Sequence, residues 1–135
     1  GPMRSGLRIG PAPREADRNV ACIVMVETAE ALANVDRICE TAGLDAIYVG
    51  PSDLTLALGG ERPGDPAVAD RLAAAVSTVV KSAERAGIAC GMHCSDGATA
   101  ARRLAEGFTF ATVSNDLSHL EKVASEHLHA ARNPH

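Results

Sequence analysis

One unit recurs along this chain of 135 residues: an alanine-rich stretch, a glycine, a run of apolar residues, and then a polar residue suited to begin a helix. The glycines end the segments Thr41-Ala42-Gly43, Arg85-Ala86-Gly87 and Ala105-Glu106-Gly107, where the end of a helix favours a residue that tolerates the left-handed conformation. The apolar runs that follow are continuous, which is typical of strands buried on both faces of a parallel sheet. The repeat therefore predicts an α/β fold in which strands alternate with helices through right-handed crossovers.

The repeat also indicates where the elements begin and end. Helix starts are marked at Thr28, Asp65-Pro66, Ser95-Asp96 and Asn115-Asp116, because short polar side chains cap helices and proline suits the first helical position. Four β/α units fit either a four-stranded doubly wound sheet or half of an eight-stranded barrel, and the pattern alone does not distinguish them. We expect strands at 20–26, 45–49, 88–93 and 109–113, and helices at 29–41, 53–58, 66–86, 97–106 and 116–132.

The N-terminal residues are not expected to belong to this domain. Gly1-Pro2 ahead of Met3 resembles the remnant of a cleaved tag, so we interpret residues 1–3 as that remnant and the start methionine. Residues 4–19 contain Pro11 and Pro13 and are predicted to be an irregular leader. Residues 20–135 then form one domain, which is a length that supports a single core.

Composition excludes several classes of function. The net charge of −4 is spread along the chain, whereas a nucleic-acid surface needs clustered Lys and Arg. The apolar runs are too short to span a membrane, and no apolar signal segment is visible near the start. The four cysteines, Cys22, Cys39, Cys90 and Cys94, do not have the spacing of a zinc site, so we expect reduced thiols and a cytoplasmic location.

Two of the apolar runs lead to a carboxylate. Glu27 follows the run that ends at Val26, and Asp53 follows the run 46–49 after Gly50-Pro51-Ser52. Because parallel α/β proteins place their chemistry at the C-terminal ends of strands, adjacent ends would bring both carboxylates within reach of one metal ion. Oxygen ligands suit Mg²⁺ or Mn²⁺. Each acid also has an ordinary structural interpretation, since Glu27 could complement a helix dipole and Asp53 could cap a helix that begins at Leu54.

His93 is the histidine that ends a predicted strand. It would therefore lie on the same rim as the two carboxylates, which makes it the candidate catalytic residue for acid–base chemistry. The alternative is a structural histidine whose ring nitrogens are satisfied by hydrogen bonds.

Several of these segments together resemble a known family. Residues 24–32 (VMVETAEAL), 50–54 (GPSDL), 91–94 (GMHC) and 108–116 are similar, in this order, to the HpcH/HpaI aldolases, which are metal-dependent, pyruvate-type class II aldolases related to the citrate lyase β subunit. The resemblance extends from Gly6 to the C-terminus. It implies that the chain corresponds to the C-terminal half, strands five to eight, of a (β/α)₈ TIM barrel.

The resemblance also implies roles for particular residues. Glu27 and Asp53 correspond to the metal ligands for Mg²⁺, Mn²⁺ or Co²⁺, and the backbone of Gly50, Pro51, Ser52 and Asp53 corresponds to the loop that binds the carboxylate of a small 2-keto acid. The implied function is a lyase that makes or breaks a carbon–carbon bond through a metal-stabilised enolate.

The chain also departs from the family pattern. The general-base histidine and the keto-binding arginine of the family have no counterpart here, and Met25 replaces a glutamine that many members carry. These departures leave open a non-catalytic or partner subunit of a split aldolase. They also leave open a repurposed biosynthetic enzyme that performs a lyase, hydratase or cyclisation step in the same pocket.

A half barrel exposes the edges of its first and last strands, and such edges promote association. We expect a two-fold homodimer that pairs the first strand of each copy with the fourth strand of the other, or assembly with a chain that supplies the missing half.

Overall fold

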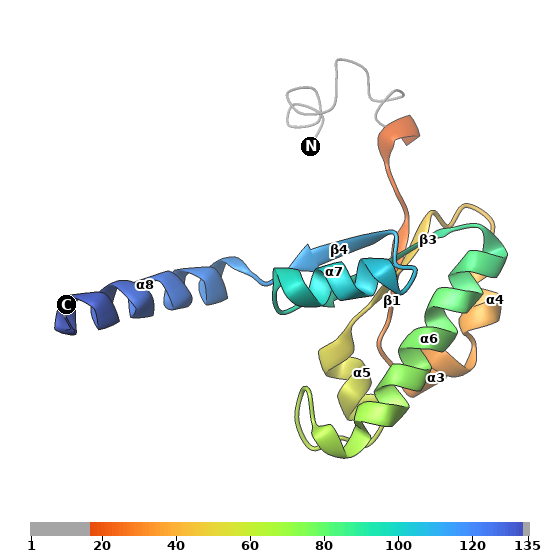
Figure 1. Ribbon diagram of the computed structural model, residues 1–135. Coiled ribbons are helices and arrows are strands. Elements are labelled where there is room, and N and C mark those ends of the chain that lie inside the picture. Colours follow the sequence, from red (N-terminus) through yellow and green to blue (C-terminus); the bar gives the residue numbers. More distant parts are fainter. Residues whose placement is uncertain (1–16, 134–135) are drawn as a thin grey trace.

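The computed structural model describes residues 17–133 (Figure 1). A 3₁₀ turn, η1 (Asp17–Asn19), precedes one sheet of four parallel strands in the order β1-β2-β3-β4. The parallel strands confirm the predicted α/β fold, and their sequential order is that of half a barrel. The strands are β1 (Ile23–Val26), β2 (Ala46–Val49), β3 (Ala89–Cys94) and β4 (Phe110–Val113).

Helices follow every strand. After β1 the predicted single helix is divided into α3 and α4 at Asn34, whose φ of −109° and ψ of 11° lie outside the helical range and whose side chain donates to the Glu30 carbonyl at 2.9 Å. Such a local side-chain bond competes with the helical ladder, and the sequence pattern did not reveal it. The helical elements are α3 (Ala29–Ala33), α4 (Val35–Cys39), α5 (Pro51–Ala57), the 3₁₀ turn η2 (Pro66–Val68), α6 (Ala69–Ala86), α7 (Gly97–Ala105) and α8 (Asp116–Arg132).

The predicted helix caps are present. The side chains of Thr28, Asp65, Asp96 and Asn115 each accept a hydrogen bond from a backbone N–H two or three residues further on, at 2.7–3.0 Å. Gly87 ends α6 with a φ of 70°, the left-handed conformation predicted there. Local chemistry therefore determines most element boundaries in this chain.

One face of the sheet packs against the helices and forms the core. Alternate strand residues point to this face, and helix α6 supplies much of the apolar surface that covers it. Burial raises the pKa of the Cys90 thiol in this core to about 12, so that this cysteine stays protonated and unreactive. The core strand residues are Val26, Ile47, Val49, Cys90, Met92 and Cys94, and they meet Val35, Leu54, Val76 and Val79 of the helices.

The opposite face corresponds to the inside of a barrel. Ile23 and Met25 of β1 are each 49% exposed on it, and the side chains of Tyr48, His93 and Phe110 are half-buried. The sheet is therefore covered by helices on one face and partly open on the other, as expected for half of a barrel.

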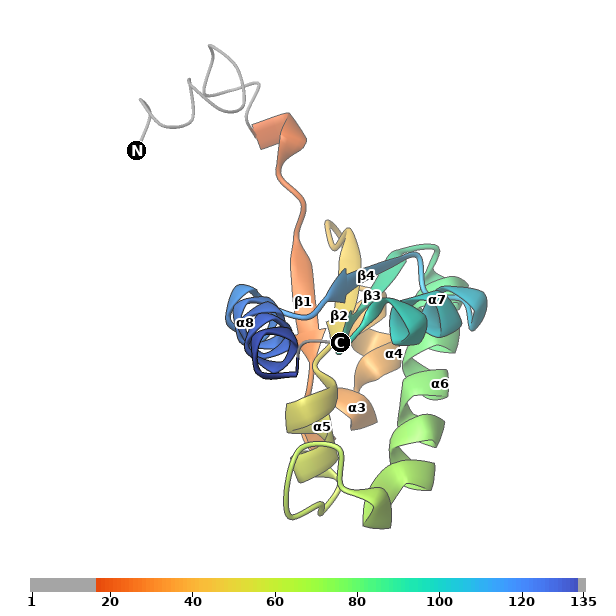
Figure 2. The same ribbon diagram turned by 60° about the vertical axis from the view of Figure 1, so that its left-hand side comes forward.

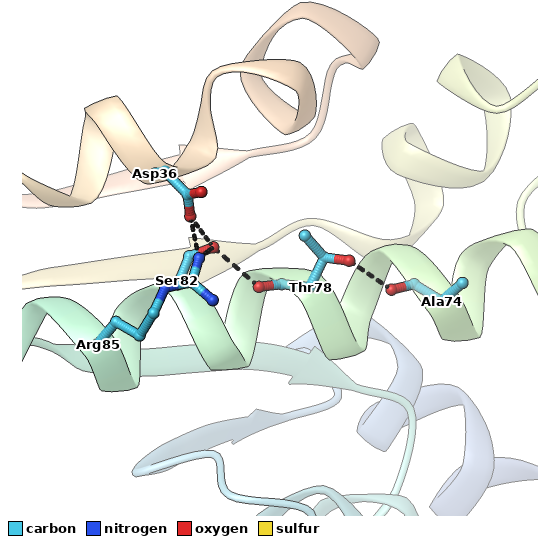
Figure 3. A network of polar contacts seen from close by, with 5 residues as sticks. All are labelled: Asp36, Ala74, Thr78, Ser82 and Arg85. Carbon is cyan, nitrogen blue, oxygen red and sulfur yellow. Dashed lines mark hydrogen bonds and ion pairs between the residues drawn. The ribbon is translucent and has the colours of Figure 1, made fainter.

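A network of polar contacts connects α4 to α6 on the helical side of the sheet (Figure 3). The Ser82 hydroxyl donates to the Asp36 carboxylate at 2.5 Å, and Arg85 pairs with the same carboxylate oxygen. The hydrogen bond from Ser82, together with the charge and hydrogen bond of Arg85, holds the pKa of Asp36 below its usual value. Ser82 Oγ also lies 3.0 Å from the Thr78 carbonyl oxygen, so the network extends along α6.

Helix α8 points away from the rest of the molecule (Figure 1). It follows Ser114, whose φ of 56° turns the chain after β4, and it extends away from the sheet in Figure 1 and is seen nearly end-on in Figure 2. None of its residues is buried, although it carries the exposed apolar side chains Leu117, Leu120, Val123 and Leu128. Among the described residues, no helix combines the length and apolar character needed to cross a membrane.

Candidate active site

The carboxylate of Glu27 lies directly over Gly50. Val26 pairs with Val49 in the parallel register, so Glu27 and Gly50 follow at neighbouring strand ends. A Cβ atom placed on Gly50 would lie 2.6 Å from Glu27 Oε2 and 3.2 Å from Glu27 Cβ, so a side chain there would require the Glu27 carboxylate to move. Gly50 therefore allows the Glu27 carboxylate to approach the backbone at the start of α5.

Asp53 lies in the first turn of α5 and is exposed. The helix begins at Pro51 with Gly50 in the N-cap position, whereas the sequence predicted a start near residue 53. The interpretation of Asp53 as the cap of a helix beginning at Leu54 is therefore wrong. Proline at the first helical position explains the earlier start, because its fixed φ favours the helix and its missing N–H is not needed there.

A pocket of about 240 Å³ opens at these strand ends. It brings together Gly50, Pro51, Ser52 and Asp53 with His93, all of which were predicted site residues, and adds Met25 and Tyr48. Glu27 borders the pocket through its contact with Gly50 and does not itself line it. Three larger hollows, of about 480, 430 and 370 Å³, lie on α3–α4 and around α6, and no predicted site residue lines any of them.

His93 is held by hydrogen bonding to a neighbouring strand. Its Nδ1 lies 3.0 Å from Thr112 Oγ1, and the same hydroxyl is hydrogen-bonded to the phenol of Tyr48. The Tyr48 ring stacks on Phe110 with ring centroids 6.0 Å apart. Sequence reasoning missed Tyr48 and Thr112, although Tyr48 precedes Gly50 by two residues and therefore faces the same side of the strand.

The two carboxylates fit a divalent ion only in part. Within residues 17–133 the side-chain carboxylates of Glu27 and Asp53 form no hydrogen bond or ion pair, so their oxygen atoms are available as the hard donors that Mg²⁺ and Mn²⁺ favour. The described residues contain no group of three or more His, Cys, Asp or Glu side chains able to hold a metal. Further ligands would have to be water, substrate or another chain, as is common for Mg²⁺.

Comparison with known sequences identifies the family. The profile of the HpcH/HpaI aldolase/citrate lyase family matches residues 4–122. The chain belongs to this family. A family relative from Rhizorhabdus wittichii, a hydroxypyruvate/pyruvate aldolase, is 38% identical over 98% of this chain and 53% of its own length. A 5-keto-4-deoxy-D-glucarate aldolase of Salmonella paratyphi C is 36% identical over 76% of this chain and 39% of its own length.

A solved family structure agrees with the sequence comparison. The crystal structure of an HpcH/HpaI aldolase/citrate lyase family protein from Burkholderia cenocepacia superposes with a TM-score of 0.79 at 34% identity, covering 97% of this chain and 48% of that one. The chain thus spans about half the length of the family members it matches. This partial coverage fits the predicted C-terminal half of the barrel.

Proposed function

We propose that this chain is an aldolase-type domain that binds a divalent metal and a small 2-keto acid and takes part in carbon–carbon lyase chemistry. The observation that carries the proposal is the contact of Glu27 with Gly50, which places a carboxylate beside the pocket lined by Asp53 and His93. In a member of the HpcH/HpaI family, this combination supports an aldolase site more strongly than any other function.

The metal would be held by Glu27 and Asp53, and Mg²⁺, Mn²⁺ or Co²⁺ would suit their oxygen atoms. Such an ion, when bound, supplies Lewis-acid stabilisation of the negative charge that develops on a keto oxygen. The backbone of Gly50, Pro51, Ser52 and Asp53 would hold the carboxylate of the keto acid, because these residues line the pocket beside the carboxylates.

His93 would supply acid–base function. It lines the same pocket, and imidazole is the side chain that most often exchanges protons under physiological conditions. Met25, in place of the family glutamine, lines the pocket with an apolar side chain.

Assembly would complete the site. Burial of three surfaces would be favourable, because they expose apolar side chains or unpaired strand edges. They are the open face that carries Ile23 and Met25, the edges of β1 and β4, and the exposed apolar side of α8. A two-fold homodimer, or a chain that supplies the other half of the barrel, would cover this surface and add groups to the pocket.

One observation favours a second candidate function. Among residues 17–133, those that line the pocket include no arginine or lysine, although a keto acid is an anion. A non-catalytic or partner subunit of a split aldolase, or a repurposed enzyme with lyase, hydratase or cyclisation chemistry, would be compatible with that composition.

Activity on keto-acid aldols distinguishes these functions. We expect Mn²⁺-dependent release of pyruvate, measured by coupling to lactate dehydrogenase, at a rate about 10²–10⁴-fold below ordinary enzymes, since this is the usual contribution of one missing general acid–base group. Loss of this activity in Glu27→Gln, with retention in Glu30→Gln, would support the proposal. Pyruvate release that is independent of Mn²⁺ and of Glu27 would contradict it.

A further inference from the structure

A chain of three hydrogen-bonding side chains crosses the open face of the sheet. The phenol of Tyr48 on β2 bonds to the hydroxyl of Thr112 on β4, and Thr112 Oγ1 lies 3.0 Å from His93 Nδ1 on β3. Strands β2 and β4 are not neighbours, because β3 lies between them. The contact between Tyr48 and Thr112 therefore spans a whole strand.

Gly91 makes this crossing possible. In the register, Tyr48 pairs with Gly91 and His93 pairs with Thr112, so the residue beside Tyr48 on β3 has no side chain. The ring of Phe110 fills the space over Gly91, since a Cβ there would lie 2.1 Å from Phe110 Cζ. Tyr48 stacks on that ring and reaches past Gly91 to Thr112.

The number of protons restricts how the three groups can bond. Thr112 has one hydroxyl proton and Tyr48 has one, and within residues 17–133 the Thr112 hydroxyl contacts only Tyr48 and His93. If Tyr48 donates to Thr112 and Thr112 donates to His93, both hydroxyl protons take part in hydrogen bonds between these three side chains. If His93 donates from Nδ1 instead, one of the two hydroxyl protons has no acceptor among these groups.

Relative acidity favours the first arrangement. A phenol, with an ordinary pKa of about 10, is a better donor than an aliphatic hydroxyl, and a neutral imidazole is the most basic of the three groups. A chain that runs from the most acidic donor to the most basic acceptor is also strengthened by mutual polarisation. These acidities favour the donor direction from Tyr48 to Thr112 to His93 Nδ1.

We infer that Thr112 is a positioning residue, which together with Tyr48 keeps the proton of neutral His93 on Nε2. This inference rests on the proposed function in taking the pocket beside His93 as the ligand site. The pocket then receives an imidazole N–H donor, which would stabilise negative charge on an oxygen of the bound keto acid. His93 then acts as a hydrogen-bond donor that keeps its proton, and the groups that transfer protons in the reaction are others.

Nitrogen NMR measures the tautomer directly. Protein labelled with ¹⁵N-histidine would be studied by long-range ¹H–¹⁵N correlation at about pH 9, where an ordinary imidazole with a pKa of about 6.5 is neutral. His93→Gln assigns the His93 signals among the five histidines of the chain. We expect wild-type His93 to carry its proton on Nε2 and to show an Nδ1 shift typical of a hydrogen-bond acceptor.

Three variants test the role of the hydroxyl chain. Thr112→Val, which keeps the shape, should lower the ratio of Nε2–H to Nδ1–H by roughly two- to tenfold, the factor contributed by one hydrogen bond of ordinary net strength. Thr112→Ser should restore the wild-type ratio, and Tyr48→Phe should produce a smaller change because the bond between Thr112 and His93 remains. Cooperative unfolding of each variant would confirm that it is folded.

The outcomes separate the two proposals. A wild-type His93 with its proton mainly on Nδ1, or an identical ratio in wild type and Thr112→Val, would overturn the inference. The NMR measurement needs neither metal nor keto acid. Its result on the tautomer of His93 is therefore valid even if Mn²⁺ calorimetry on the same samples shows no binding. That second result would count against the proposed function alone.

Discussion

Glu27 Oε2 occupies the position that a side chain on residue 50 would need, 2.6 Å from an ideal Cβ. The two residues lie 23 positions apart in the sequence and meet because β1 and β2 are parallel neighbours in register. The glycine therefore belongs to the candidate metal site as much as the carboxylate does.

Gly50→Ala should weaken metal binding without removing either carboxylate. The new methyl group displaces Glu27, and we expect Mn²⁺ affinity to fall by roughly 10–100-fold, as for other changes that disturb the orientation of a metal ligand. Calorimetric titration should show a similar or larger loss in Glu27→Gln and Asp53→Asn. Glu30→Gln, which changes an exposed carboxylate outside the pocket, serves as the control, and a loss there equal to that in Gly50→Ala would contradict this account.

Gly91→Ala should destabilise the sheet. A Cβ at this position would lie 2.1 Å from Phe110 Cζ, so the ring must move, and overpacking of this kind costs about 1–3 kcal/mol of unfolding free energy. Urea denaturation would report the loss. The double variant Gly91→Ala with Phe110→Leu should recover part of it, and a strictly additive result would show that the two residues do not contact each other.

Stability should depend on the ionisation of Asp36. Its pKa is lowered in the folded protein, first by the hydrogen bond from Ser82, so the native state favours the carboxylate. The stability that the ionised carboxylate contributes is fully present above the pKa of Asp36 in the unfolded chain, about 3.9. It is lost as the pH falls through the lower pKa of Asp36 in the folded protein. We expect Asp36→Asn to reduce stability at neutral pH and to flatten its decline in acid. An acid transition unchanged in both Asp36→Asn and Ser82→Ala would contradict this.

Assembly should depend on the apolar side of α8. Leu120 is 70% exposed, and a helix without any buried residue gains little from its own packing. We expect Leu120→Glu to lower the mass measured by light scattering or to reduce solubility, because the apolar side would no longer be covered by another chain. Lys122→Glu, on the opposite side of the same helix, should have no such effect. A wild-type protein that remains a cooperative, soluble monomer at micromolar concentration would refute the prediction of assembly.

The sequence predicted most of the local structure because local chemistry decides it. Glycine at the end of α6 and the caps at Thr28 and Asn115 act within a few residues, so their effect can be inferred without the fold. The interruption at Asn34 and the start of α5 at Pro51 were not predicted, although each has a local cause, the bond from Asn34 to the Glu30 carbonyl and the preference of proline for the first helical position.

The candidate site likewise combines features that the sequence predicted with features that it did not. The types and order of Glu27, Gly50, Asp53 and His93 were sufficient to predict that the C-terminal strand ends carry chemistry and that the chain resembles one aldolase family. The hydrogen bonds of Tyr48 and Thr112 could not be predicted, because they depend on the register of three strands and on the ring of Phe110.

The sequence by itself determined the alternation of strands and helices, their caps and the family to which the chain belongs, because these follow from spacing and residue type. Only the tertiary structure decided which atoms meet: Glu27 over Gly50, and His93 bonded through Thr112 to Tyr48. The physical reason is that a contact between distant segments depends on strand register. A shift of one residue would turn each of these side chains to the other face of the sheet.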